Sequence, residues 1–279
     1  APMLASLDIE LVNVSDSGRK RPHNEDSAII DRDLGLALVA DGMGGYKAGE
    51  VASAIAAKVV LDGVRAGQST HHFTRQHATE SSSYEADLIR HTITDANQHI
   101  FRTAHEIPQC QGMGTTIVMA LFSGSRVTIG HVGDSRIYLF RGESLQQVTN
   151  DHSLVQELID RGFFTPEEAQ ANTPKNLVTR ALGIDETVEV DIQELTTEPD
   201  DIYLLCSDGL NDMVNDEEIR LTLSKYSANL VQAAHELVQL ANAGGGKDNI
   251  SVVLARPRAV HAATAGIFTK LQSLWSRRS

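Results

Sequence analysis

The sequence predicts an α+β fold in which two antiparallel sheets pack face to face and helices cover their outer surfaces. Strand-like runs of apolar and β-branched residues are separated in places by only a few turn residues, for instance Ser-Gly-Ser at 123–125 and Gly-Asp-Ser at 133–135. Such short spacers are typical of antiparallel hairpins and not of parallel crossovers. Helical periodicity occurs in a pair of segments early in the chain and in another pair late. Because no internal repeat or second domain boundary is visible, two helix-covered sheets satisfy this order of elements.

The individual elements follow from residue type and spacing. The expected strands, rich in β-branched and large apolar residues, are 9–14, 34–40, 115–122, 126–132, 136–140, 188–192, 202–206 and 250–255. The expected helices, which repeat apolar residues every three or four positions, are 48–64, 84–104, 154–161, 216–223 and 228–241. A further helix begins at Thr165-Pro166-Glu167, because Thr is a good N-cap and Pro suits the first helical position. Residues 67–83 are polar, so they predict a long loop with solvated histidines.

Length, composition and charge narrow the class of protein. A chain of 279 residues with 41% apolar residues can bury a full core as one large domain. No run approaches the roughly 18 to 20 apolar residues of a membrane helix, and no secretory signal is visible. Residues 256–279 carry five basic groups and no acid, which leaves 19 basic and 37 acidic groups on the other 255 residues, a balance of −18. We therefore expect no nucleic-acid partner. Two cysteines make no disulfide framework, which favours the cytoplasm.

Carboxylates stand in tight turns that are spread along the whole chain. Glu25 and Asp26 occur in RPHNED, Asp41 in VADGMGG, Asp208 in LLCSDGL and Asp248 in GGKDN. Each turn adjoins a strand-like run, so the fold can gather these acids at one rim. Acids held so closely repel one another, and burial adds to the cost, unless cations neutralise them. Because all-oxygen ligand sets suit Mg²⁺ or Mn²⁺, the pattern predicts a metal-dependent hydrolase.

Eight short motifs carry a resemblance to a known family. They are Arg21-Pro-His-Asn-Glu-Asp26, Asp41-Gly-Met-Gly-Gly45, Gly114-Thr-Thr116, Gly133-Asp-Ser-Arg136, Asp151-His-Ser153, Thr179-Arg-Ala-Leu-Gly183, Ser207-Asp-Gly-Leu210 and Gly246-Lys-Asp-Asn249. Their order and residues resemble those of the bacterial form of the metal-dependent protein phosphatase (PPM) family, the type 2C serine/threonine phosphatases. The resemblance covers residues from about 10 to 255. It implies a four-layer α-β-β-α sandwich in a phosphatase domain at 1–258, with a flap subdomain at about 151–183.

The resemblance also implies the roles of the acids. Asp41 is the candidate ligand shared by two core ions, Mn²⁺ or Mg²⁺, whose bridging hydroxide would attack the phosphorus of phosphoserine or phosphothreonine. Asp208 and Asp248 would complete the protein ligands of the first ion. The carbonyl of Gly42 would contact the second ion, with Glu25 at or next to it.

Other residues of the motifs are expected to support the ions or the substrate. Arg21 has the family spacing for the arginine that binds the substrate phosphate through its planar fork. Asp134 can join Asp208 at a weak third metal site, or it can be a hairpin-turn aspartate without a metal. Asp26 would hold ordered waters, or it caps a turn without a metal role. Asn249 is expected to hold the ligand residues in place without binding a metal itself.

The proton donor for the leaving group is left open by the sequence. Animal members of the family carry histidine where this chain has Met43, which cannot transfer a proton. A metal-bound water or another histidine must take this role. His152 is the nearest histidine in a motif, but it can equally order the start of the flap. The flap also lacks the histidine that many bacterial relatives place just before the proline of this segment, since Thr173 precedes Pro174 here.

Partners and alternative functions complete the expectations. The resemblance implies phosphorylated proteins as substrates, a cognate serine/threonine kinase, a monomer, and no membrane partner. Two other classes remain open, namely a catalytically silent fold that acts as a binding module and a hydrolase of small phosphoesters. Residues 259–279 form a basic amphipathic tail, with an apolar stripe that includes Phe268 and Trp275. Docking on the acidic body is the favoured role of this tail, against a partner protein, an anionic membrane surface or disorder.

Overall fold

The computed structural model describes residues 8–45, 47–74, 83–174 and 177–258, without the side chains of residues 70–74 and 170. The predicted basic tail at 259–279 lies outside these residues, as do the side chains of the three histidines in the 67–83 segment. Within the described part of the chain, no helix is long and apolar enough to cross a bilayer.

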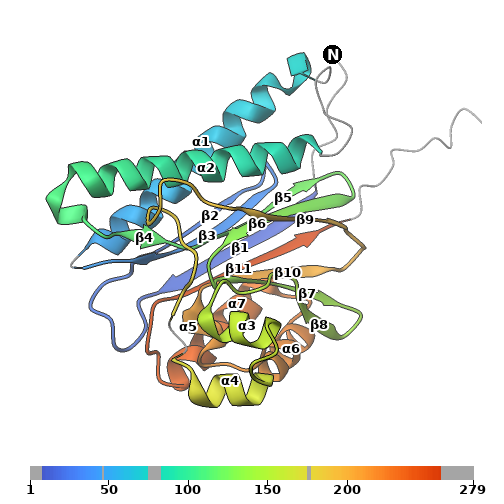
Figure 1. Cartoon of the computed structure of the whole chain (residues 1–279). Coiled ribbons are helices and arrows are strands. Elements are labelled where there is room, and N and C mark those ends of the chain that lie inside the picture. The colour runs from blue at the N-terminus through green and yellow to red at the C-terminus, as the bar shows by residue number, and fades with distance from the viewer. Residues whose placement is uncertain (1–7, 46, 75–82, 175–176, 259–279) are drawn as a thin grey trace, which may run out of the picture.

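Two antiparallel sheets lie face to face in the centre of the molecule (Figure 1). The first sheet contains, in spatial order, β1 (Ile9–Asp16), β11 (Ile250–Pro257), β10 (Ile202–Cys206), β7 (Arg136–Arg141) and β8 (Ser144–Gln147). The second contains β2 (Asp26–Asp31), β3 (Leu36–Met43), β5 (Ile117–Ser123), β6 (Arg126–Val132) and β9 (Asp191–Thr196), with the short β4 (Gly114–Thr115) beside β3. The expected pair of antiparallel sheets is confirmed.

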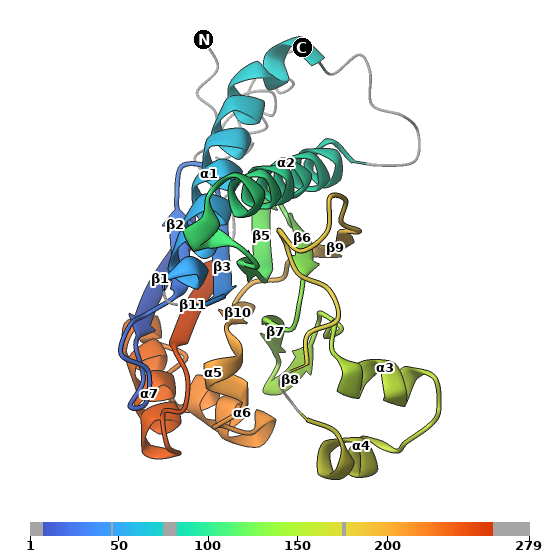
Figure 2. The ribbon, with the colours of Figure 1, turned by 60° about the vertical axis from the view of Figure 1, so that its left-hand side comes forward.

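Helices cover the outer face of each sheet. The long helices α1 (Ala48–Thr74) and α2 (Tyr84–Glu106) pack on the second sheet, followed by the 3₁₀ turn η1 (Pro108–Cys110). The first sheet is covered by α5 (Asp208–Asn211), α6 (Asp216–Lys225) and α7 (Leu230–Ala243). Between β8 and β9, α3 (Leu154–Asp160) and α4 (Pro166–Asn172) extend away from the sandwich (Figure 2). The result is the expected four-layer α-β-β-α arrangement.

The central strands are apolar on both faces because each face meets another layer. In β3, Leu36 and Leu38 pack with the residues of α1 and α2, while Ala37 and Val39 face the first sheet. The alternation follows from the strand period of two. In β10 the same alternation places the buried thiol of Cys206 on the helix side. A polar side chain that continues the odd-numbered series of β3 must therefore lie between the sheets.

The helix that was expected to begin at Thr165 is confirmed together with its cap. The Thr165 side chain accepts a hydrogen bond from the Glu168 amide at 3.2 Å, and the Glu168 carboxylate accepts one from the Thr165 amide at 2.9 Å. Pro166 occupies the first turn, where no amide donor is needed. The capping box thus satisfies two donors at the start of α4.

The prediction of a loop beginning at residue 67 is wrong for its first half, because α1 continues to Thr74. Two contacts hold the extra turns. The Tyr84 hydroxyl donates to the Gly67 carbonyl at 2.7 Å, and the Gln68 side chain donates to the Leu34 carbonyl at 2.9 Å. Polar composition therefore did not end the helix, since neighbouring elements hold its backbone.

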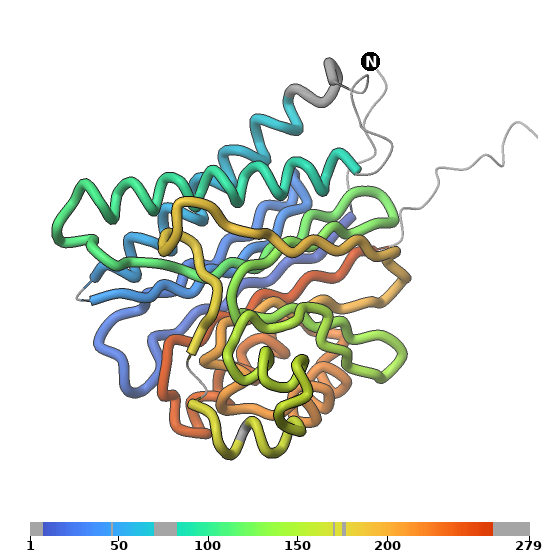
Figure 3. The backbone as a smooth tube through the Cα atoms, in the orientation of Figure 1, coloured from blue at the N-terminus to red at the C-terminus, as the bar shows by residue number. Residues whose placement is uncertain are grey.

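The Gly-Asp-Ser spacer at 133–135 does not close a hairpin, although its length predicts one. It leads from β6 in the second sheet to β7 in the first sheet, a path that can be followed in Figure 3. Gly133 has φ +108°, and a Cβ there would lie 2.6 Å from the Cβ of Thr116. The spacer is thus a tight crossing between the layers that only glycine allows.

Three smaller differences concern strands of the sheet edges. The strand expected at 188–192 lies at Asp191–Thr196, because pairing with β6 starts at Asp191 opposite His131. The strands β2 and β8 have mixed composition and partly exposed faces, so no apolar run marked them. An edge strand can tolerate such residues because only one neighbour and one face need to be satisfied.

Gly130 in β6 lies directly against α2, and it gives a test of the packing. A Cβ at Gly130 would lie 2.3 Å from Cγ2 of Ile89 and 3.1 Å from Cδ1 of Ile93. We expect Gly130→Ala to lower the free energy of unfolding by about 1 to 3 kcal/mol through overpacking, measured by urea denaturation. Gly45→Ala is the matched control, since nothing lies within 4 Å of a Cβ there.

The cause of the loss can be assigned with a second variant. Ile89→Ala removes Cγ2, the atom that a Cβ at Gly130 would strike. The double variant should therefore be less destabilised than the sum of the two single changes. Strict additivity would contradict a direct clash between these positions.

Candidate metal centre

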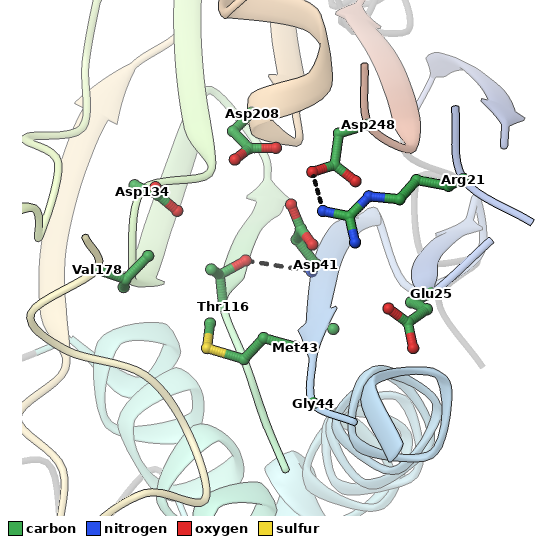
Figure 4. Close-up of a pocket in the computed structure, with 11 residues that line it drawn as sticks. Arg21, Glu25, Asp41, Met43, Gly44, Thr116, Asp134, Val178, Asp208 and Asp248 are labelled. Carbon is green, nitrogen blue, oxygen red and sulfur yellow. Dashed lines mark hydrogen bonds and ion pairs between the residues drawn. The ribbon is translucent and has the colours of Figure 1, made fainter. Parts of the chain in front are cut away.

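Acidic side chains that are distant in the sequence meet at one edge of the sandwich (Figure 4). A cavity of about 190 Å³ opens there. Among the described residues that line it, the acids are Glu25, Asp41, Asp134, Asp208 and Asp248. The predicted residues Arg21 and Gly42 also line this cavity, and Asp26 and Asn249 lie behind it. The structure thus brings together every residue that was expected to bind cations or phosphate or to support those that do.

Asp41 lies on the floor of the cavity because of its register in β3. It continues the series Ala37 and Val39, which faces the space between the sheets. Its amide donates to the Thr116 hydroxyl at 3.1 Å, and its carbonyl accepts from the Thr116 amide at 2.9 Å and the Thr115 hydroxyl at 2.8 Å. The two threonines of the Gly-Thr-Thr motif therefore fix the backbone of this aspartate.

Asp208 and Asp248 reach the same edge from neighbouring strands. Asp208 follows β10, and Asp248 precedes β11, which runs antiparallel to β10 with Cys206 opposite Val252. The end of one strand and the start of the other therefore coincide. One oxygen of Asp248 accepts from the Asn249 amide at 2.9 Å, and the other accepts from Nη2 of Arg21 at 2.7 Å.

Asp134 enters the cavity from the crossing between β6 and β7. The Ser135 hydroxyl lies 2.7 Å from that of Thr116, which joins this crossing to the threonines that hold Asp41. Asp134 itself is 7% exposed. The expected hairpin turn at Asp134 is wrong, since the spacer joins two different sheets and places the carboxylate next to the other acids. The choice between a third metal site and an aspartate without a metal stays a prediction.

Glu25 and Gly42 are held by an unusually close approach of α1. A Cβ on Gly49, in the first turn of α1, would lie 2.8 Å from the carbonyl carbon and oxygen of Gly42 and 3.0 Å from Cδ of Glu25. The Gly42 amide donates to the Glu25 carbonyl at 3.2 Å, and the Ser53 hydroxyl donates to the same carbonyl at 2.6 Å. Gly49 is thus required for the backbone of both candidate ligands to reach the site.

Asp26 connects the two sheets behind the cavity. It stands opposite Asp41 in the β2–β3 pair, and its Oδ2 accepts hydrogen bonds from the hydroxyls of Ser207 at 2.8 Å and Ser251 at 2.7 Å. These serines belong to the first sheet and to its connection with α5. Asp26 is therefore anchored across the sandwich, which is more than a turn cap requires.

Asn249 organises the loop that carries Arg21 and Glu25. Its Oδ1 accepts from the Glu25 amide at 2.9 Å, and its Nδ2 donates to the carbonyls of Ser17 at 3.0 Å and His23 at 2.8 Å. The side chain is 4% exposed. Arg21 lies at the mouth of the cavity with about half of its side chain exposed, so its guanidinium can reach a ligand from solvent.

The chemistry of the donor set fits divalent cations. Three buried oxygens of the acids at this site receive no hydrogen bond from the described residues, namely Glu25 Oε1, Asp26 Oδ1 and Asp208 Oδ1. Burial, followed by repulsion from Asp26 and Asp208, raises the pKa of Asp41 well above its usual value. Burial and the charge of Asp134 raise the pKa of Asp208 in the same way. Cations bound here would supply the missing partners and remove the repulsion.

Two further carboxyl groups show the same effect to a smaller degree. Burial raises the pKa of Asp134 to about 6, with Asp151 as the next contributor. Burial also raises the pKa of Asp26 to about 6, against the stabilising hydrogen bonds from Ser251 and Ser207. A cluster of acids with raised pKa values in a cavity is typical of a functional site.

No histidine is among the described residues that line the cavity. Met43 lies in the wall, as expected, and Val178 from the returning part of the flap segment (151–183) is the other large apolar group there. His152 is 8% exposed, its Nδ1 accepts a hydrogen bond from the Gly133 amide, and it is not among the residues that line the cavity. It therefore does not lie where a proton donor to the leaving group would have to be.

Comparison with known proteins gives the family. The family model of protein phosphatase 2C matches residues 19–243, so the chain belongs to the protein phosphatase 2C family. The serine/threonine phosphatase Stp of Listeria monocytogenes is 40% identical over 243 residues, which cover 86% of this chain and 92% of that protein. PstP of Mycobacterium tuberculosis is 41% identical over 246 residues, 86% of this chain and 43% of that protein.

Solved structures agree with the fold. The crystal structure of the Mycobacterium tuberculosis serine/threonine phosphatase PstP has a TM-score of 0.79 and 36% identity, covering 90% of this chain and 99% of that one. A structure of the PstP catalytic domain in complex with two manganese ions has a TM-score of 0.73 and 37% identity, covering 89% and 97%.

Several residues that build the site were not predicted. Thr115 and Thr116 were part of a recognised motif, but no role was assigned to them. Gly49 and Ser53 lie on α1 and act only through contacts with Glu25 and Gly42. The glycine preceding Glu50 in a helix start was the available signal for Gly49, because glycine is unfavourable inside a helix unless close packing requires it.

Asn249 gives a test of how the loop is held. Asn249→Ala removes one acceptor and two donors from a buried position, so we expect a loss of about 1 to 3 kcal/mol in the free energy of unfolding. Amide hydrogen exchange should accelerate at residues 17–25. Asn13→Ala is the control, since it removes only an exposed bond to the Ala28 carbonyl. Unchanged exchange in the loop of the Asn249 variant would contradict this role.

Proposed function

We propose that this chain hydrolyses phosphoserine and phosphothreonine in proteins at the cavity between the sheets, with its carboxylates holding two divalent cations and Arg21 receiving the phosphate. The observation that carries the proposal is the convergence of five acids, with orphaned buried oxygens, beside one exposed arginine. The family and the named relatives support the class, since the protein is a metal-dependent protein serine/threonine phosphatase. The silent-fold alternative is disfavoured, because none of the expected metal aspartates is missing.

The proposed ligands divide between the two ions as the resemblance implied. Asp41 would be shared between them, Asp208 and Asp248 would hold the first ion with it, and the Gly42 carbonyl and Glu25 would hold the second. The manganese complex of PstP supports the choice of Mn²⁺, with Mg²⁺ as the alternative. Bound divalent ions supply an acidified water as nucleophile and neutralise charge on the phosphoryl oxygens.

Arg21 is suited to orient the phosphate. In this structure it uses Nη2 to pair with Asp248, and this bond, ahead of the charges of Glu25 and Asp41, raises the pKa of Arg21 above its usual value. Its remaining N–H groups form a planar fork that matches two phosphoryl oxygens. Met43 and Val178 form an apolar wall on the other side of the cavity. Because neither can exchange a proton, no side chain of this wall serves as the acid.

A third, weaker cation is proposed between Asp134 and Asp208. Repulsion by Asp134 is the second cause, after burial, of the raised pKa of Asp208. Asp212 and Asp151 add negative charge nearby. Two carboxylates completed by water make a loose oxygen site, which is why occupancy should need more metal than the core pair.

The proposed biological setting is a cytoplasmic, monomeric enzyme that acts on phosphorylated proteins and opposes a serine/threonine kinase. The names of the bacterial relatives support the substrate class. Both described cysteines are buried free thiols, which supports a reducing compartment. We propose residues 1–258 as the phosphatase domain, with the flap at about 151–183 and a tail at 259–279. Comparing turnover of a folded phosphoprotein with that of free phosphoserine tests the small-phosphoester alternative.

Substitution of Asp41, the proposed shared ligand, is the most direct test of the two-cation proposal. Asp41→Asn keeps the size of the side chain but halves its capacity to bridge cations, so hydrolysis of para-nitrophenyl phosphate should fall well over ~100-fold. Circular dichroism should show an intact fold. Reversible loss of wild-type activity on chelation is the companion measurement, and full activity in excess chelator would remove the proposal.

Arg21 separates phosphate binding from metal binding. Arg21→Ala should raise KM and lower kcat, because the lost contact is with the substrate. Mn²⁺ affinity measured by calorimetry should not weaken, since the variant also removes the cation that pairs with Asp248. Arg21→Lys is the control for charge without the planar fork. A large loss of Mn²⁺ affinity would assign the arginine a structural role instead.

A further inference from the structure

His152 lies where the base of the flap segment meets both sheets. Its main-chain carbonyl accepts a hydrogen bond from the Thr179 amide at 2.9 Å. Two residues along, the Leu154 amide donates to the Leu177 carbonyl, also at 2.9 Å. These bonds tie the outgoing and returning ends of the flap segment together. Val178, between the two, lines the cavity. The segment around His152 is therefore bonded on both sides of a residue in one wall of the site.

The same histidine holds the crossing that carries Asp134. The His152 amide donates to the Gly133 carbonyl at 2.9 Å, and the Gly133 amide donates to Nδ1 of the His152 ring at 3.0 Å. Gly133 is thus bound at both of its backbone groups by one residue. Because Nδ1 accepts a hydrogen bond, it carries the lone pair, and the proton of the neutral ring is on Nε2.

The far side of the ring faces a carboxylate shared with an arginine. Nε2 lies 3.2 Å from Oδ2 of Asp191, the first residue of β9, and Nη1 of Arg180 donates to Oδ1 of the same group at 2.7 Å. Nη1 also lies 3.1 Å from Nε2, although both atoms carry protons. Their common acceptor, Asp191, holds them together. His152 and Arg180 thereby anchor the flap segment to the second sheet.

His131, His152 and Asp191 have ligand atoms within 4.8 Å of one another, but His152 and Asp191 already bind other partners. The lone pair of His152 is taken by the Gly133 amide, and Nε2 is a donor. His131 stacks on His152 with ring centroids 4.6 Å apart and donates from Nε2 to the Asn150 carbonyl at 2.9 Å. Arg180 already supplies the positive charge that Asp191 needs.

We infer that His152 is a positioning residue that couples the base of the flap segment to the Gly133–Asp134 crossing, so that the cavity wall at Val178 and the Asp134 carboxylate are set together. The ring spans the two sides with its two nitrogens, one on the Gly133 amide and one on Asp191. The inference rests on the proposed function in one respect, which is the role of Asp134 as a ligand of the third cation.

Two substitutions separate the two sides of the ring. His152→Leu removes both nitrogens. His152→Asn places an amide oxygen where Nδ1 stands, so it can still accept from Gly133, but it cannot reach Asp191. Arg141→Lys is the matched control for lost stability, because it breaks a bidentate pair with the buried Asp201 at the opposite end of β7.

The first measurement is amide hydrogen exchange of the metal-free protein. His152→Leu should accelerate exchange at Gly133 and also at the Leu154 and Thr179 amides of the flap base. His152→Asn should protect Gly133 as in the wild type and accelerate only the flap base. The inference would be overturned if exchange in His152→Leu accelerated only at Gly133 or only at the flap base. It would also be overturned if Gly133 exchanged faster in His152→Asn than in the wild type.

The second measurement is Mn²⁺ binding by calorimetry. His152→Leu should weaken the loosest site by roughly 10-fold, the scale of losing support behind a metal ligand, while His152→Asn and Arg141→Lys should bind as the wild type does. Equal affinities in His152→Leu and Arg141→Lys would overturn the coupling to Asp134. Asp134→Ala is run beside them and should lose that site. If Asp134→Ala binds Mn²⁺ as the wild type does, the third cation is wrong, and hydrogen exchange still decides the role of His152.

Discussion

Mutual repulsion among buried carboxylates is the constraint on which this structure depends. Asp41, Asp134 and Asp208 are forced together by strands whose other residues are driven between layers by their apolar character. Left to themselves these acids would separate or take up protons, which is what their raised pKa values express. The hydrophobic sandwich supplies the free energy that holds them. Without bound cations, the clustered acids therefore lower the folding stability of the sandwich.

Short polar bonds, rather than the sheets alone, give the acids their positions. Hydroxyl groups of Thr115, Thr116, Ser207 and Ser251 and the amide of Asn249 bind backbone or carboxylate atoms of the site. Ser207, Ser251 and Asn249 belong to the sheet or loop opposite to the residue that they hold. The two sheets are thus joined at the catalytic edge by polar contacts and elsewhere by apolar packing. Such contacts are directional, which apolar packing is not.

The sequence predicted the parts of the site that have a local signature. Asp41, Asp208 and Asp248 each stand in a glycine-containing turn next to a buried strand, so residue type and position were enough. The crossing at Asp134 was mistaken for a hairpin, because a three-residue spacer has the same length whether its strands share a sheet or not. The end of α1 was placed ten residues early, since polarity says nothing about the contacts that Tyr84 and Leu34 make with the helix. The role of Gly49 could not be predicted either, because it depends on contacts with Gly42 and Glu25 that only the folded chain makes.

The ion pair between Arg21 and Asp248 has a thermodynamic consequence. While the guanidinium neutralises Asp248, one of its terminal nitrogens is withheld from an incoming phosphate. Under the proposed function, a cation that takes over the charge of Asp248 would release this nitrogen for the phosphate, so cation and phosphate would each favour the binding of the other. By linkage such an effect is reciprocal, so phosphorylated ligands would tighten cation binding by the same factor. Arg21 is thus an internal counter-ion of Asp248 in this structure, and its exchange for a cation would make the two binding events cooperative.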